Sequence, residues 1–230
     1  MRKDIHRPPH LYLDNATYFI TASTMNRGYD IRRLKPATPL RNIAFEMDDV
    51  KLVALASLLQ EMVKFYDFKL IGWVILRNHY HLLLEIIRGL TLPDFIKNLH
   101  GKSSFQFNKI DKYTGRKIWY QYWDTCITDE KTMYMRLNYI HNNPVKHGYA
   151  KDLIDYQYSS YHAYFEKFGR EWLDDLWERY PVVDYIEADD FDGVARGKHD
   201  IRRLKPATPK CEGVANFSSR KHNKKGRVLP

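Results

Sequence analysis

The sequence is poor in cysteine and contains no long run of apolar residues. Only two cysteines, Cys126 and Cys211, occur among the 230 residues. They form neither a metal-binding CxxC spacing nor a disulfide framework, so we expect a cytoplasmic protein. The longest stretch dominated by apolar residues, Leu52–Leu59, has eight residues, whereas a membrane-spanning helix needs about 20. Because residues 1–4 begin no apolar segment typical of a signal peptide, we expect neither secretion nor a membrane partner.

The sequence also has no excess of acidic residues, since its formal net charge is +9. The excess positive charge lies in residues 196–230, which hold eleven Lys and Arg residues against two acidic ones, so residues 1–195 are neutral overall. Within this neutral part, residues 97–117 hold six bases and one acid, and residues 171–192 hold nine acids and one base. A basic segment and a basic tail indicate a polyanionic partner, although an ordinary solvated face is the alternative interpretation.

Composition and a repeat predict the domain organisation. Aromatic residues make up 14% of the chain, which excludes disorder throughout and favours one globular domain over residues 1–168. We expect an acidic helical extension over residues 169–195 and a basic disordered tail over residues 196–230. The decapeptide DIRRLKPATP occurs at residues 30–39 and again, unchanged, at residues 200–209. The first copy is interpreted as an inserted loop, because loops and termini tolerate insertions.

Helix and strand patterns alternate along the globular part. Residues rich in β-formers predict strands, and apolar residues at helical spacing predict helices. The strands are expected over residues 18–24, 68–76, 79–87 and 117–128, and the helices over residues 52–66, 91–110 and 129–143, the last ending before Pro144. The first six elements match the split βαβ, ferredoxin-like plan: an α+β fold with an antiparallel sheet and two helices on one face. The remaining helix is free to pack on the other face.

His79-Tyr80-His81 is the most specific local signal for chemistry. Residues i and i+2 of a strand point to the same face, so the two imidazoles can form a bidentate metal site. The alternative is a pair of solvent-exposed histidines, since this pattern is common by itself.

Tyr139 and Asn143 lie four residues apart on one face of the last predicted helix. We expect Tyr139 to lie off the buried stripe of that helix, which is predicted as Met133, Leu137 and Ile140. Packing of the helix across the sheet would bring an amide oxygen and a phenol beside the histidine pair. Taken alone, however, Tyr139 is better explained as a half-buried aromatic residue and Asn143 as a helix C-terminal residue before proline.

Two segments together resemble a known family. Residues 78–85 (NHYHLLLE) and 137–146 (LNYIHNNPVK) resemble, in this order, the signature motifs of the single-tyrosine HUH transposases, and more narrowly those of the REP-associated tyrosine transposases. The resemblance covers about residues 8–165. It implies that His79 and His81 are metal ligands, that Asn143 is the third ligand, and that Tyr139 is the nucleophile.

The resemblance also implies an activity. It implies a divalent metal, Mg²⁺ or Mn²⁺, and a single-stranded DNA substrate with hairpin elements that is cleaved through a 5′-phosphotyrosine and rejoined. We expect backbone contacts from the basic residues of the body, which are Lys97, Lys102, Lys109, Lys112, Arg116 and Lys117. The alternatives are a catalytically silent DNA-binding protein and a metal-dependent phosphodiesterase without a covalent intermediate. Either a monomer or a dimer is compatible with these expectations.

Overall fold

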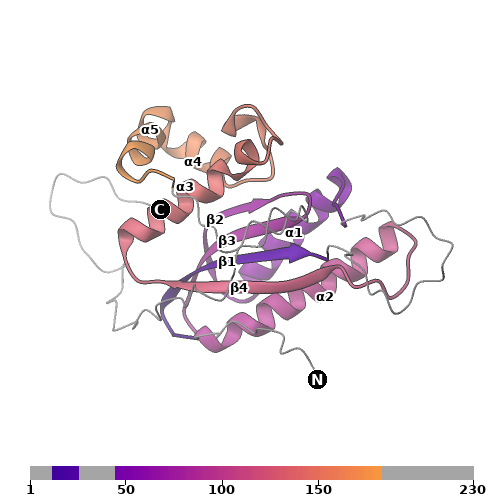
Figure 1. The fold of residues 1–230 in the computed structure, drawn as a ribbon. Helices are drawn as coiled ribbons and strands as arrows, with labels where there is room; N and C mark the ends of the chain where they lie inside the picture. Colours follow the sequence, from indigo (N-terminus) through magenta and orange to yellow (C-terminus); the bar gives the residue numbers. More distant parts are fainter. Residues whose placement is uncertain (1–11, 26–44, 183–230) are drawn as a thin grey trace, which may run out of the picture.

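The computed structural model describes residues 12–25 and 45–182 (Figure 1). Its strands and α-helices alternate in the predicted order, with short 3₁₀ turns at Gly89–Thr91 and Leu153–Asp155. The elements are β1 (Ala16–Thr24), α1 (Asp49–Phe65), β2 (Lys69–Ile75), β3 (His79–Ile86), α2 (Leu92–Ile110), β4 (Trp119–Ile127), α3 (Glu130–Lys146), α4 (Tyr161–Phe168) and α5 (Arg170–Arg179). None of the helices in these two stretches has the length and apolar character of a membrane span.

The four strands form one antiparallel sheet in the order β2-β3-β1-β4. Helices α1 and α2 cover one face of the sheet, and α3 crosses the other face with α4 and α5 outside it (Figure 1). This arrangement confirms the predicted α+β, ferredoxin-like fold with an extra helix on the opposite face. Helices α1 and α3 begin at acidic caps, since Asp48 accepts from Lys51 N at 2.9 Å and Asp129 accepts from Thr132 N at 2.8 Å.

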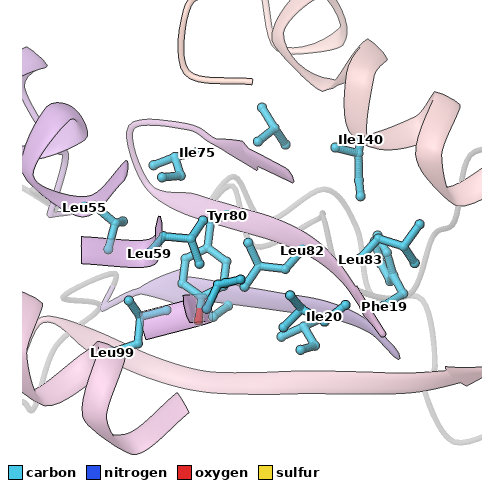
Figure 2. Close-up of a cluster of buried hydrophobic side chains, with 14 of the residues drawn as sticks. Phe19, Ile20, Leu55, Leu59, Ile75, Tyr80, Leu82, Leu83, Leu99 and Ile140 are labelled. Carbon is cyan, nitrogen blue, oxygen red and sulfur yellow. The ribbon is translucent and has the colours of Figure 1, made fainter. Parts of the chain in front are cut away.

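Alternation along β3 sends its side chains to two different layers. Tyr80 and Leu82 point into the layer of α1 and α2, where Leu59 lies beside them (Figure 2). His79 and His81 point the other way. The position of the His81 ring shows this, since it lies 5.4 Å from the ring of Tyr139 on α3. The sheet therefore has an apolar face and a face that carries the predicted site.

Helix α3 differs from the prediction at its C-terminal end, because it continues through Pro144 to Lys146. The expected end at Asn143 is therefore wrong. A proline lacks only its own N–H, so in a last turn it removes one helical hydrogen bond. The bond at the end of the helix, from His147 N to Asn143 O, still forms at 3.0 Å. The continuation matters for the site, since it keeps Lys146 on the same helix as Tyr139 and Asn143.

The acidic segment is helical over Arg170–Arg179, and Gly169, at φ +79°, separates this helix from α4. Helix α5 contacts α3, where Asn138 Nδ2 donates to Leu176 O at 3.2 Å and to Tyr180 O at 2.8 Å. Residues 183–195 of the acidic segment, the basic tail and both copies of the decapeptide lie outside the described residues.

Candidate active site

The site forms where β3 meets α3. The ring centroids of His79 and His81 lie 5.0 Å apart, and the ring of Tyr139 lies 5.4 Å from that of His81. All three side chains and that of Asn143 are buried, so the interpretation of the pair as exposed histidines is wrong. The expectation that Tyr139 lies off the buried stripe is also wrong: it is 1% exposed, because its ring packs against those of His81 and Phe19 on the sheet.

Each histidine of the pair is oriented by a hydrogen bond at Nδ1. His79 Nδ1 lies 2.6 Å from Asn78 Oδ1, and His81 Nδ1 lies 2.8 Å from Thr21 Oγ1 on β1. These contacts fix the ring orientations and leave Nε2 as the atom available to a ligand. The sequence motif identified the two histidines but not Thr21, which reaches the site only through strand pairing.

Two buried polar atoms in this cluster make no hydrogen bond within the described part of the chain, namely His79 Nε2 and Asn143 Oδ1. Asn143 Nδ2 donates to Tyr139 O at 3.0 Å, which turns the amide so that Oδ1 is the remaining acceptor. Leaving a buried polar atom unsatisfied costs roughly 1–3 kcal/mol. An imidazole nitrogen and an amide oxygen, buried at that cost, fit a divalent cation as ligands.

Electrostatics keep His79 in the form that a ligand needs. Burial is the main cause that lowers the pKa of His79 well below its usual value, and the neighbouring His81, His147 and Lys146 lower it further, against a smaller raising effect of the Asn143 amide. The imidazole is therefore neutral at physiological pH and has a lone pair to offer. Among the described residues no group of three histidine, cysteine or carboxylate side chains could hold a metal, so the third ligand depends on the Asn143 amide.

Two cations and a further histidine surround the cluster, and the motif analysis missed all three. Lys146 Nζ lies 5.2 Å from the centre of the Tyr139 ring, and the guanidinium of Arg136 lies 4.4 Å from the centre of the Phe19 ring. The ring of His147 lies 5.1 Å from that of His79. Helical spacing could have found both cations, because Arg136 lies three residues before Tyr139 and Lys146 lies seven residues after it.

Phe19 connects these groups within the cluster. Its ring stacks on that of His81 with 5.4 Å between centroids and meets the Tyr139 ring edge-on at 6.1 Å. A buried aromatic wall of this kind restricts the rotamers of both neighbours. The nucleophile candidate and the metal-ligand candidate are therefore held against the same side chain.

The six basic residues predicted to contact DNA lie elsewhere. They belong to α2 and to the segment between α2 and β4, and α2 covers the face of the sheet opposite to His81 (Figure 1). Arg116 pairs with Asp111 and stacks on Phe45, with 4.6 Å between its guanidinium and the ring centre. Lys102 lies 3.6 Å from Glu61. The structure does not bring this group to the histidine pair, and its contact with DNA stays a prediction.

Comparison with known proteins places this arrangement in context. Residues 41–143 match a family model described as "Transposase IS200 like". A Haemophilus influenzae protein that bears the name REP-associated tyrosine transposase is 34% identical over 116 residues. That match covers 46% of this chain and 66% of the relative, slightly less than two thirds of its length. The REP-associated tyrosine transposase of Escherichia coli is 24% identical over 152 residues, covering 66% of this chain and 79% of that protein.

A solved structure shares the fold. It is described as a REP-associated tyrosine transposase bound to a REP hairpin, and it covers 80% of this chain and 98% of its own with a TM-score of 0.55 and 20% sequence identity. At that identity the likeness concerns the arrangement of helices and strands.

Proposed function

We propose that this chain is a REP-associated tyrosine transposase of the IS200-like family, which cleaves and rejoins single-stranded DNA at hairpin-associated sites. The names of both curated relatives support this proposal. The hairpin bound in the solved structure of similar fold supports hairpin DNA as the partner. The remaining support comes from the geometry of this chain itself.

One observation carries the proposal: a tyrosine, two histidines and an asparagine from two elements converge in one buried cluster. Tyr139 is the proposed nucleophile. Its phenolic oxygen, after losing the proton, attacks the scissile phosphorus, the bond from phosphorus to the 3′ oxygen breaks, and that oxygen takes up a proton. The products are a 5′-phosphotyrosine and a free 3′-hydroxyl. Attack of a 3′-hydroxyl on the phosphotyrosine reverses the step and joins two strands.

His79, His81 and Asn143 would hold the divalent ion, Mg²⁺ or Mn²⁺, which when bound supplies positive charge to polarise the phosphate. Asn78 and Thr21 hold the two imidazoles in the orientation that this requires. Lys146, beside the ring of Tyr139, places a positive charge where the phenolate and the phosphate develop negative charge. Burial of the cluster keeps these charges in surroundings of low polarity, where they act more strongly.

The test is to trap the covalent intermediate. Labelled single-stranded hairpin DNA is incubated with the protein and Mn²⁺, and a denaturing gel is read for a protein–DNA adduct. We expect an adduct with the wild type and none with Tyr139→Phe, which removes only the hydroxyl. Tyr113→Phe, an exposed tyrosine on the opposite layer, is the matched control and should form the adduct normally.

Two results would contradict this assignment. An adduct at the wild-type rate in Tyr139→Phe would mean that another of the 17 tyrosines is the nucleophile. A wild type that binds the hairpin with Mn²⁺ present but forms no adduct would favour a catalytically silent binding protein.

A further inference from the structure

Strand β4 carries two tryptophans that differ in their surroundings. Trp119 is buried, with its ring stacked 4.6 Å from that of His100 and its Nε1 donating to Ser103 Oγ at 2.9 Å. Trp123 is half-buried and lies on the other face of the strand. Trp119 therefore packs in the layer of α2, whereas Trp123 belongs to the opposite face of the sheet.

Strand pairing places Trp123 beside the histidine pair. Thr21 on β1 lies directly opposite His81 on one side and opposite Trp123 on the other. Directly opposed residues of antiparallel strands point to the same face, and the hydrogen bond of Thr21 to His81 shows that this is the face of the site. Two strand spacings separate Trp123 from His81, which is about 10 Å between their backbones.

A second aromatic residue lies on the same side. The pairing of β1 with β4 shifts between Ala22 and Thr24, so the strand bulges next to Tyr120. The rings of Tyr120 and Trp123 then lie 6.3 Å apart at 41°. Tyr120 is 41% exposed, and β4 is the outermost strand in the sheet order of the described residues. An aromatic pair is thus presented at the edge of the sheet, with β1 between it and the histidine pair on β3.

We propose that Trp123, together with Tyr120, is a stacking platform for a nucleobase of the single strand next to the scissile phosphate. This inference rests on the function proposed above and adds residues that position the substrate. A single strand exposes its bases as flat apolar surfaces joined to phosphates, so a strand with a phosphate at His81 and Tyr139 would bring a neighbouring base to β4. Aromatic side chains hold such bases whatever their sequence, because every base has a π-face.

The experiment measures binding without cleavage. Fluorescence anisotropy in EDTA gives the dissociation constant of a labelled single-stranded hairpin oligonucleotide and of a series in which one nucleotide at a time is abasic. We expect Trp123→Ala to weaken binding of the intact oligonucleotide roughly 5- to 150-fold, the range for loss of one stacked base. Trp123→Phe should keep most of the affinity. Phe105→Ala, which truncates a 73% exposed aromatic on α2, is the matched control and should bind as the wild type does.

The abasic series locates the base. In the wild type, one abasic position should weaken binding. In Trp123→Ala that same position should have no further effect, because removing the base and removing the indole eliminate the same stacking contact. Unchanged affinity in Trp123→Ala, or equal weakening of all oligonucleotides with the abasic profile preserved, would overturn the platform. In that case adduct formation by the wild type and its absence in Tyr139→Phe would leave the proposed function standing. A wild type without affinity for single strands would overturn both.

Discussion

The two faces of the central sheet treat buried polar groups in opposite ways. On the face toward α1 and α2, the Tyr80 hydroxyl lies 2.8 Å from His100 Nε2, with leucines around the pair. On the face toward α3, His79 Nε2 and Asn143 Oδ1 are equally buried but make no hydrogen bond within the described residues. The comparison teaches that exposure does not mark the candidate site here. The mark is a set of buried polar atoms whose hydrogen-bonding capacity the fold does not use.

His79 and His100 make the contrast specific. His79 is buried and His100 is half-buried, and desolvation lowers the pKa of each, to about 3 for His100. Both are therefore neutral at physiological pH. His100 has a hydroxyl partner and belongs to the fold, whereas His79 keeps one nitrogen for a ligand.

The largest effect is expected where the polar face loses a ligand. His81→Ala should lower Mn²⁺ affinity, measured by calorimetry, by more than the roughly 10- to 100-fold that follows loss of a ligand's hydrogen-bond partner. Adduct formation should be lost with it. Single-strand binding should stay within about tenfold of the wild type, since it depends mainly on phosphate contacts. His100→Gln is the control from the other face and should retain both metal binding and the adduct. Normal Mn²⁺ affinity in His81→Ala would contradict the site.

On the apolar face the effect should be on stability instead. Leu82, fully buried between the sheet and the helices, lies next to His81 in sequence but points to the other layer (Figure 2). Leu82→Ala should lower the free energy of unfolding by roughly 2–5 kcal/mol, measured by urea denaturation. Adduct yield per folded molecule should be unchanged at a temperature where the variant remains folded. A specific loss of activity without destabilisation would show that the two faces are not separate.

A smaller change addresses the orientation of the ligand. Thr21→Val keeps the shape of the side chain but removes the hydroxyl that contacts His81 Nδ1 at 2.8 Å. We expect Mn²⁺ affinity to fall about 10- to 100-fold while the protein remains folded. Thr17→Val, two positions beyond Phe19 on the same face of β1, provides a control for the substitution itself and should leave metal affinity unchanged. Equal affinities in wild type and Thr21→Val would show that the hydroxyl does not orient the ring.

The smallest expected effect is a pH dependence from the apolar face. Burial lowers the pKa of His100 to about 3, whereas an unfolded histidine titrates near 6.5. Between these values the unfolded chain binds the extra proton, so stability is complete above about pH 6.5 and falls on acidification. At pH 5 this histidine should reduce the free energy of unfolding by about 2 kcal/mol relative to pH 7. Urea denaturation of the wild type and of His100→Gln at both pH values measures it, and equal pH dependence in the two proteins would refute it.

Much of the difference between the two faces of the sheet could be predicted from the sequence, because it follows from local patterns. Alternation in β3 correctly predicted that both histidines share one face, and helical spacing correctly placed Tyr139 and Asn143 together. Burial of Tyr139 was mispredicted, since it depends on packing against Phe19 and His81 of the sheet, which lie far from Tyr139 in the sequence. The end of α3 was mispredicted because a proline in a last turn removes only one hydrogen bond.

The partners of the site were harder to predict for a different reason. Thr21 and Phe19 reach the cluster through the pairing of β1 with β3, a contact across more than fifty residues that no local spacing reveals. Arg136 and Lys146, in contrast, were accessible from helical periodicity once Tyr139 had been singled out. The three metal ligands and the nucleophile remain assignments to be tested by the experiments above.

The alternation along β3 also bears on how faithfully the chain folds. If β3 paired with its neighbours one residue out of register, Tyr80 and Leu82 would move to the side of α3, and the imidazoles would enter the leucine layer. In such a misfolded sheet, His81 would lose Thr21 and the ligands would be separated from Asn143. A slipped molecule could therefore be compact and helical yet unable to bind Mn²⁺. Stoichiometric metal titration of a preparation would then count the correctly registered molecules, which circular dichroism cannot distinguish from the slipped ones.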